Sequence, residues 1–409
     1  MPILLQNATL TEAHGVSRPG HHLLIEGDRI AAISDTPITP PPGATVINLG
    51  GRHLLPGLID AHVHIVASLA DLAANAAQPS SLAALRAGRM AGAMLDRGFT
   101  TVRDMGGADI GFAQAIAEGT IPGPRLVTCG KALSQTGGHC DSRIRSDDRP
   151  WYEHRVGAMG RLVDGVDSVR RAAREELRAG AHFIKIMANG GIASPTDPIH
   201  ALQYSADEIR AVVEEARNAG TYVAAHLYTD AAIRRAVECG VHSLEHCNLI
   251  TPETARLAAK RGCVAVPTLV TYEILAAEGA SMGLPPESVA KIEAVRSAGL
   301  ESLQIMADAG LPMAYGSDLL GGMQPHQAGE FTLRGAVLPA SEVLASATTV
   351  AAGLCGLEGM AGVLQAGAYA DLIAVDADPL ADLSVLGHAG RHMPLIIAAG
   401  RVHKDWLSR

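Results

Sequence analysis

The chain has 409 residues, of which 48% are hydrophobic and 18% charged, with a formal net charge of −9 at pH 7. This composition supplies a sizeable core and excludes a disordered chain, and the lack of a basic stripe argues against a nucleic-acid partner. Six scattered cysteines without CxxC spacing, no signal-like start and no apolar window of membrane-spanning length predict a cytoplasmic protein that does not enter a membrane.

Residues 1–54 and 368–409 both show short strand patterns separated by turns, of which Gly27-Asp28 is one. The predicted strands lie within 4–10, 22–33, 44–55, 368–378 and 394–404. We predict that the two chain ends build one small β-sandwich domain and that residues 55–367 are inserted between them as a second domain.

Residues 55–367 repeat one pattern of apolar strand, loop, helix and glycine. Predicted strands lie at 57–65, 99–105, 125–133, 183–188, 221–228, 243–247, 264–270 and 312–318. Predicted helices include 81–96, 167–180, 230–239 and 288–309, and a capping box of Ser205 and Glu208 marks the clearest helix start. Eight such units favour an α/β fold of the (β/α)8 TIM-barrel type. A doubly wound sheet is the alternative, but no Gly-rich phosphate turn follows the first strand.

Metal-ligating side chains end several of these strands, and the active site of such a barrel lies at the carboxyl ends of its strands. His62 and His64 alternate on the first strand and therefore point the same way. His226 and His246 lie on the fifth and sixth strands, and Asp318 ends the eighth. Each residue alone has an ordinary explanation, such as a core histidine or a helix-capping aspartate. Their joint occurrence at one rim predicts a site for a divalent metal such as zinc.

Lys185 interrupts the apolar strand at 183–188. Burial disfavours an ammonium, so the pKa of this lysine should fall and its neutral amine should become available. A neutral amine can react with CO2 to form a carbamate, whose two oxygens can each hold one metal ion. The alternative is an ordinary ion pair with Asp60 or Glu245.

Together, these residues and their motifs resemble the amidohydrolase superfamily along nearly the whole chain. "LLPGLIDAHVHI" is similar to its strand-one signature and "AGAYADLIAVDADP" to its C-terminal signature. The segments "TTVRDMGG", "SQTGGHCDSR", "KIMANGGIASPTDP", "VAAHLYTD" and "SLEHCNLI" resemble the imidazolonepropionase-like branch. That branch includes metal-dependent Xaa-Pro dipeptidases, carboxypeptidases and ochratoxin-type amidases.

The resemblance implies a binuclear metal-dependent enzyme that cleaves the amide bond of dipeptides or N-acyl amino acids. Two divalent ions, with zinc expected, would occupy the site. The more buried ion would take His62, His64 and Asp318, and the more exposed ion would take His226 and His246. The expected partner is a small amide or dipeptide, and relatives of this kind often form homo-oligomers.

Further roles also follow from the resemblance. Carboxylated Lys185 and a hydroxide would bridge the ions, and Asp318 would serve as general base and then as acid. His139 and Tyr228 match positions that contact the substrate carbonyl or its terminal carboxylate. Their ordinary alternatives are a surface-loop histidine and a rim tyrosine.

Four residues are candidates for binding a substrate carboxylate. Gly190 and Gly191 could let backbone N–H groups approach an anion. Arg103 and Arg143 could supply positive charge, with structural ion pairs as their alternative.

Other functions remain as alternatives. A mononuclear ring-opening hydrolase or deaminase would use the same fold. Such sites have no bridging lysine, so the presence of Lys185 counts against this alternative. A non-enzymatic scaffold relative would typically lose metal ligands, whereas this chain keeps all six expected ones, the four histidines together with Lys185 and Asp318. A serine or cysteine hydrolase lacks support because no GxSxG-type elbow occurs on the barrel strands.

Overall fold

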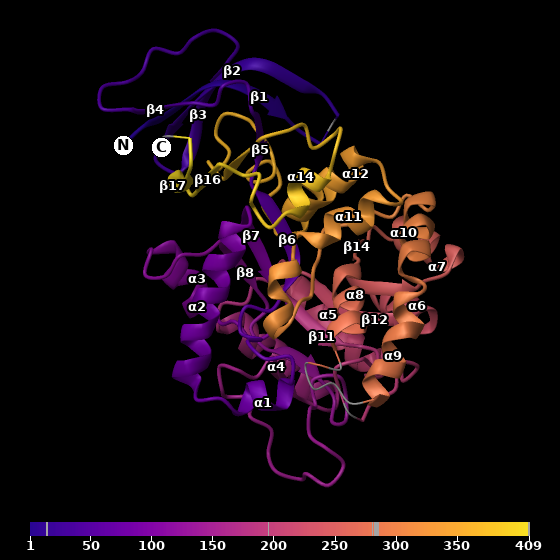
Figure 1. Ribbon diagram of the computed structural model, residues 1–409. Helices are drawn as coiled ribbons and strands as arrows, with labels where there is room; N and C mark the ends of the chain where they lie inside the picture. Colours follow the sequence, from indigo (N-terminus) through magenta and orange to yellow (C-terminus); the bar gives the residue numbers. More distant parts are fainter. Residues whose placement is uncertain (14, 195, 280, 282–285, 408–409) are drawn as a thin grey trace.

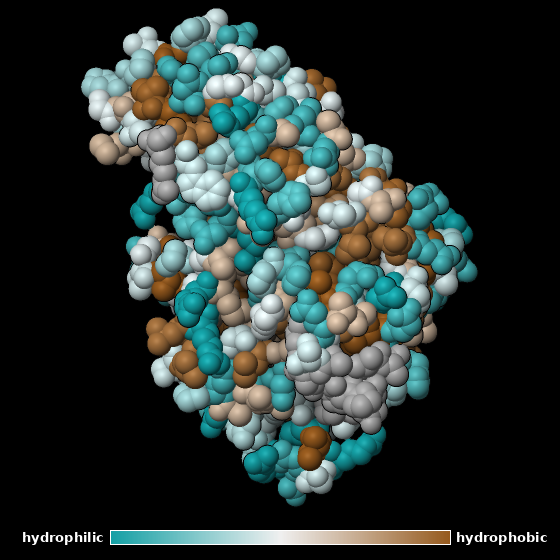
Figure 2. Space-filling model, in the orientation of Figure 1, coloured by the Kyte–Doolittle hydropathy of each residue, from teal (hydrophilic) through white to brown (hydrophobic). Residues whose placement is uncertain are grey.

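The computed structural model describes residues 1–13, 15–194, 196–279, 281 and 286–407. A sheet built from both chain ends lies at one end of the molecule, and a ring of strands and helices forms the rest (Figure 1). On the face shown in Figure 2, hydrophilic and hydrophobic residues are interspersed. Among the described residues, we find no helix with the length and apolar character needed to cross a bilayer.

The terminal sheet has eight strands in the order β17-β16-β15-β5-β1-β2-β3, with β4 paired to β1. Its strands are β1 (Ile3–Thr11), β2 (Ser17–Glu26), β3 (Arg29–Ser34), β4 (Thr45–Asn48), β5 (His53–Pro56), β15 (Leu372–Val375), β16 (Leu395–Ala398) and β17 (Arg401–Asp405). β5 and β15 join the two chain ends through antiparallel pairs such as Leu55 with Ile373. The prediction that the termini form one β domain is therefore confirmed.

We propose the domain division at residues 54/55 and 367/368 on the basis of this sheet. Leu5, Leu23, Leu54 and Leu372 belong to one buried cluster that draws on both ends of the chain. β5 continues to Pro56, so the chain passes from the sheet almost directly into the first barrel strand. Residues 408–409 of the predicted terminal domain lie outside the described residues.

The barrel strands are parallel, as predicted. They are β6 (Leu58–Val63), β7 (Phe99–Asp104), β8 (Arg125–Thr128), β9 (Ala132–Ser134), β11 (Ile184–Met187), β12 (Val223–Thr229), β13 (Ser243–Leu249) and β14 (Val264–Val266). The predicted third strand is split into β8 and β9, and β10 (Gly160–Leu162) pairs with β9. Residues 312–318 carry only an isolated parallel bridge from Met313 to Ala265, yet the Ala61 N–H donates to the Tyr315 carbonyl (2.7 Å) and closes the ring.

Helices cover the outside of the ring. They are α1 (Leu72–Ala77), α2 (Ser80–Asp96), α3 (Ile110–Ala117), α4 (Val166–Arg178), α5 (Ala206–Asn218), α6 (Asp230–Cys239), α7 (Pro252–Lys260), α8 (Leu269–Glu278), α9 (Pro286–Arg296), α10 (Gly299–Asp308), η1 (Gly321–His326), α11 (Gly329–Gly335), α12 (Ala340–Ala345), the π-helical turn η2 (Ser346–Val350), α13 (Ala351–Leu354) and α14 (Ser384–Gly387). The capping box predicted at Ser205 and Glu208 opens α5.

Two predicted elements differ from the structure. The strand predicted at 264–270 ends at Val266 because Pro267 has no N–H for the sheet, and Leu269 already begins α8. The helix predicted at 288–309 is broken into α9 and α10. The break falls at Ser297 and Ala298, between the end of α9 at Arg296 and the start of α10 at Gly299.

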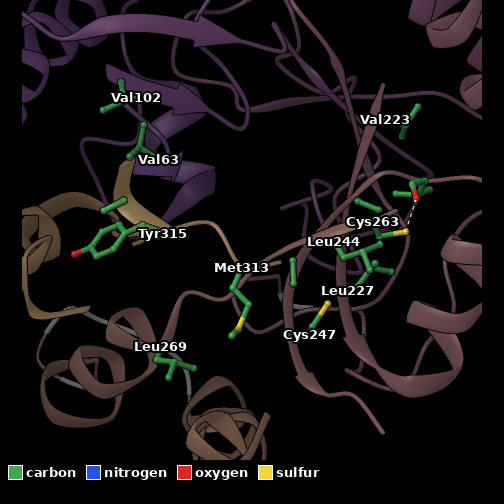
Figure 3. Close-up of a cluster of buried hydrophobic side chains, with 14 of the residues drawn as sticks. Val63, Val102, Val223, Leu227, Leu244, Cys247, Cys263, Leu269, Met313 and Tyr315 are labelled. Atoms are coloured by element: carbon green, nitrogen blue, oxygen red, sulfur yellow. Dashed lines mark hydrogen bonds between the residues drawn. The ribbon is translucent and has the colours of Figure 1, made fainter. Parts of the chain in front are cut away.

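Strand alternation separates the core from the chemistry. Val223 and Leu227 of β12 and Leu244 of β13 belong to the buried cluster that faces the helices (Figure 3). Because side chains alternate along a strand, Ala224 and His226 point to the inside of the ring. The apolar residues therefore hold the helices in place while the interior positions remain free for polar groups.

Arg103 of β7 lies fully buried inside the ring. Its Nη2 donates to both carboxylate oxygens of Glu245 (2.9 and 3.0 Å), and its other donors reach the Ala61 carbonyl, Ser243 and Tyr222. Burial alone would lower the pKa of Arg103, but the Glu245 carboxylate raises it. This arrangement corrects the expectation that Arg103 binds substrate, because every donor group is already used in the core.

Replacing Arg103 by Met should strongly destabilise the fold, because Glu245 would remain buried without its main partner. We expect the free energy of unfolding to fall by about 3–5 kcal/mol, measured by denaturant unfolding. Arg149→Met, which removes an ion pair on an exposed loop, serves as the control and should leave the unfolding midpoint unchanged. A loss below about 1 kcal/mol for Arg103→Met would contradict a central role for this pair.

Candidate metal centre

Four histidines and one aspartate converge at the carboxyl ends of the barrel strands. The ring centroids of His62 and His64 lie 5.4 Å apart, those of His62 and His246 4.9 Å, and those of His226 and His246 4.7 Å. Asp318 Oδ1 lies 3.4 Å from His62 Nε2 and 3.3 Å from His64 Nε2. Ligand atoms of His62, His246 and Asp318 all lie within 4.8 Å of one another. The structure therefore brings the five predicted ligands together.

The two histidines of β6 each have one ring nitrogen held by the protein. His62 Nδ1 lies 2.8 Å from the Glu245 carboxylate, and His64 Nδ1 lies 3.3 Å from the Gly106 carbonyl. Both partners only accept hydrogen bonds, so each Nδ1 carries the hydrogen. Their Nε2 atoms both face the Asp318 carboxylate, which raises the pKa of His62 against the effect of burial. A metal ion bound at Nε2 would take the place of a hydrogen there.

The histidines of β12 and β13 also each have one ring nitrogen held by the protein. His246 Nδ1 lies 2.8 Å from the Thr268 hydroxyl, and His226 Nε2 lies 3.4 Å from the Gly190 carbonyl. His226 is therefore turned the other way and offers Nδ1 as its free nitrogen. Outer partners of this kind fix the ring orientation of metal-binding histidines. The donor set and its outer bonds fit divalent metal ions.

Two of the predicted ligands have a backbone conformation that is uncommon for residues other than glycine. His246 has φ +70° and Asp318 has φ +51°, and Cys247 next to His246 has φ +59°. Regular alternation would point Glu245 inward and His246 outward. The left-handed turn at His246 instead lets both side chains approach His62. Such strained conformations cluster at functional sites.

Lys185 of β11 is 1% exposed and points into the same interior. Burial lowers its pKa, although the carboxylates of Glu245 and Asp318 oppose this effect. Within the described part of the chain, Lys185 forms no ion pair shorter than 4.0 Å. Asp60, one suggested partner, instead accepts from the Ser317 hydroxyl at 2.6 Å. The ion-pair alternative is therefore not formed, and the environment favours a neutral amine.

Asp318 and His226 differ in the charge that their surroundings favour. Burial alone would raise the pKa of Asp318, but the facing His62 and His64 hold it well below its usual range. The pKa of His226 lies well below its usual value because of burial and the neighbouring His139. The Asp318 side chain is 20% exposed, so this carboxylate stands at the opening of the site.

His139 and Tyr228 border the cluster, as predicted. The His139 ring stacks on His226 with centroids 4.1 Å apart, and its Nδ1 lies 2.7 Å from the Ser194 hydroxyl. Tyr228 packs edge-on against His226 at 4.7 Å, and its hydroxyl accepts a hydrogen bond from Tyr272 (3.0 Å). Burial raises the pKa of Tyr228, so its hydroxyl stays protonated.

The glycines after β11 do not serve the purpose that the sequence suggests. The Gly190 N–H donates to the Ala201 carbonyl (2.9 Å), and the Gly191 N–H donates to the Asp197 carboxylate (3.0 Å). Both N–H groups are used within the loop, which corrects the expectation that they bind a substrate anion. Glycine is needed at Gly191 because a Cβ there would overlap the His139 ring.

Arg143 also forms a structural ion pair. Its Nε and Nη2 donate to the two carboxylate oxygens of Asp141 (2.8 and 2.7 Å), and its Nη1 donates to the Arg149 carbonyl (3.0 Å). The ion-pair alternative for Arg143 is the arrangement that the structure shows.

Sequence reasoning missed four residues that support the site. Ser194 and Asp197 lie in the quoted segment after β11, where only the glycines seemed significant. Thr268 falls within the strand predicted at 264–270, and Tyr272 lies just beyond it. Each acts through a side chain far away in sequence, so local periodicity carries no signal for them. Pro195, in the same segment, lies outside the described residues.

Comparison with known proteins agrees with this geometry. The model of the amidohydrolase family matches residues 53–401. An ochratoxinase of Aspergillus niger is 33% identical over 347 residues, which covers 81% of this chain and 72% of the ochratoxinase. A crystal structure of an amidohydrolase superposes with a TM-score of 0.97 at 51% identity, covering 99% of each chain.

A prolidase crystallised with N-methylphosphonate-L-proline superposes equally well, with a TM-score of 0.97 at 49% identity, covering 99% of this chain and all of the prolidase. The resemblance to the branch with prolidases and ochratoxinases is thereby confirmed. The chain belongs to the amidohydrolase family and is a hydrolase that acts on carbon–nitrogen bonds.

Proposed function

We propose that this protein is a binuclear metal-dependent hydrolase that cleaves the amide bond of dipeptides or N-acyl amino acids. One observation carries the proposal. Each of the four converging histidines has one ring nitrogen held by the protein, which leaves the other for a metal ion. An ordinary buried histidine needs no second nitrogen left available beside other histidines, whereas each member of a ligand set does.

The ligands are assigned from their positions in the cluster. His62, His64 and Asp318 would hold one ion, and His226 and His246 the other, with zinc as the expected metal. Carboxylated Lys185 would complete both coordination shells, because its buried amine lies in the same interior. When bound, such ions polarise a carbonyl and activate water at neutral pH.

Asp318 is the residue best placed to move the proton. Its carboxylate is kept ionised by His62 and His64 and stands at the opening of the site. It would accept a proton from the attacking water as the new C–O bond forms. It would then deliver that proton to the amine nitrogen as the C–N bond breaks, so that a carboxylic acid and a free amine result.

His139 and Tyr228 would bind the substrate beside the ions. Both rings contact His226, so a carbonyl or carboxylate placed over that ligand meets the imidazole and the phenol together. The similarity to a prolidase and to an ochratoxinase supports a substrate whose leaving group is an amino acid.

Lys185 argues against the mononuclear alternative. The six cysteines are all free and buried, which supports the proposed cytoplasmic location.

A hydrolysis screen tests the function directly. Purified protein should hydrolyse some N-acyl amino acids or Xaa-Pro, Xaa-Phe and Xaa-Arg dipeptides and should contain about two metal ions per chain, measured on the same sample. Chelation should abolish activity, and added zinc should restore it. Activity that survives complete metal removal would contradict the proposal.

Lys185→Ala should lower kcat/KM by at least about 100-fold and reduce the metal content below two ions per chain, because the shared carbamate is lost. A small carboxylic acid such as propionate should restore part of the activity by replacing that carbamate. Lys260→Ala, at an exposed position of α7, is the control and should behave as the wild type. Near wild-type turnover with two ions bound to Lys185→Ala would overturn the carbamate assignment.

Asp318→Asn should lower kcat by about 100–10,000-fold because the proton shuttle is lost, while the KM changes little. Metal content must be measured on the variant, since Asp318 is also a ligand. The acidic limb of the wild-type pH–rate profile should disappear with this residue. An unchanged profile would assign the base to another group.

A further inference from the structure

His139 is held in place by two buried residues of the loop after β11. Its Nδ1 lies 2.7 Å from the Ser194 hydroxyl and 3.5 Å from the Asp197 carboxylate. Ser194 and Asp197 are 1% and 3% exposed, so both lie out of contact with bulk water. A buried carboxylate is costly unless it is well bonded. These three side chains therefore form one connected unit.

The direction of the hydrogen bonds follows from the donors available. The Ser194 hydroxyl donates its single hydrogen to Asp197, so its oxygen must accept from His139 Nδ1–H. Asp197 also accepts from the Gly191 N–H (3.0 Å) and the Gln203 amide (2.9 Å). The Gln203 carbonyl oxygen in turn accepts the backbone N–H of His139 (3.0 Å). This arrangement fixes both the hydrogen on Nδ1 and the position of the ring.

The loop that carries Ser194 and Asp197 is itself clamped from the far side. The Lys291 ammonium, on α9, donates to the carbonyls of Gly191, Ser194 and Asp197 at 3.0, 3.2 and 3.0 Å. All three donors of an ammonium group are thus spent on this loop. A loop fixed at three carbonyls can hold its side chains at a constant distance from His139.

The remaining ring nitrogen of His139 is left for the substrate. Nε2 has no hydrogen-bond partner among the residues that the structure describes, and the side chain is 12% exposed. Stacking on His226 places the ring directly beside a predicted metal ligand. The bonded nitrogen faces the loop, so Nε2 is the polar atom that a bound substrate can reach.

We propose that Asp197, acting through Ser194, is the positioning residue of His139, holding its hydrogen on Nδ1 and directing Nε2 toward the carbonyl or carboxylate of the substrate. The inference rests on the proposed function, because it assumes that His139 contacts the substrate. A purely structural role would instead have Asp197 stabilise the loop with no effect that passes through His139.

A double-mutant cycle separates these two roles, using zinc-loaded protein and the best substrate of the screen. His139→Asn should lower kcat/KM by about 100-fold or more, and Asp197→Asn by about 10–100-fold. The double variant should match His139→Asn, because Asp197 has nothing left to position. Asp164→Asn is the control, since Asp164 binds Thr136 in the loop before His139 and does not contact His139. Additive losses, or Asp197→Asn equal to the control, would overturn the proposal.

A second measurement needs no substrate and therefore distinguishes failure of this inference from failure of the proposed function. Nitrogen-15 NMR of labelled histidines identifies the His139 signal as the one missing from His139→Asn. The wild type should carry hydrogen on Nδ1, and Asp197→Asn and Ser194→Ala should shift the ring toward the other tautomer. Hydrogen on Nε2 alone in the wild type, or identical signals in all three proteins, would refute the positioning role even if no amide hydrolysis were detected.

Discussion

Charge buried inside the barrel is the constraint on which the rest of the site depends. Arg103 and Glu245 neutralise each other in the centre of the ring, and Glu245 continues the chain of contacts to His62, which faces Asp318. An unpaired ion in such surroundings costs several kcal/mol, so each group needs its neighbour. The carboxylate shared by Arg103 and His62 ties the packing of the core to the orientation of a metal ligand. The polar interior is therefore one connected structure and not a set of separate contacts.

The backbone makes its own contribution to this connected interior. A regular β13 could present only alternate side chains to the ring, yet both Glu245 and His246 are needed there. The left-handed conformations of His246 and Asp318 solve this problem at a local energetic cost. On the outer face of the same strand, Leu244 is buried in the core cluster. The site thus combines strained ligand positions with outer hydrogen bonds that leave little freedom for its rings.

The sequence was sufficient for the barrel, the terminal β domain and the candidate ligands, because strand periodicity and position along each strand are local properties. The position of each residue along its strand is enough to place His62, His226 and Asp318 at one rim. Arg103 was misjudged because its partner Glu245 lies far away in sequence. Gly190 and Gly191 were misjudged because their N–H groups are used by Ala201 and Asp197 only once the loop is folded. Nothing in the residue pattern states whether an arginine or a backbone N–H is already satisfied. The Ser194–Asp197 unit escaped notice for the same reason, since its importance appears only once His139 lies beside it.

The short connection from β5 to β6 affects the order in which parts of the chain can fold during synthesis. β5 pairs with β15, whose residues 372–375 emerge from the ribosome more than 300 residues later. Until then β5 has an open edge, and the strand that bears His62 and His64 follows directly from it. Contacts this distant in sequence form slowly because a long loop must close first. The first ligand strand therefore acquires its full support only when nearly all of the chain is available, which couples completion of the site to completion of the polypeptide.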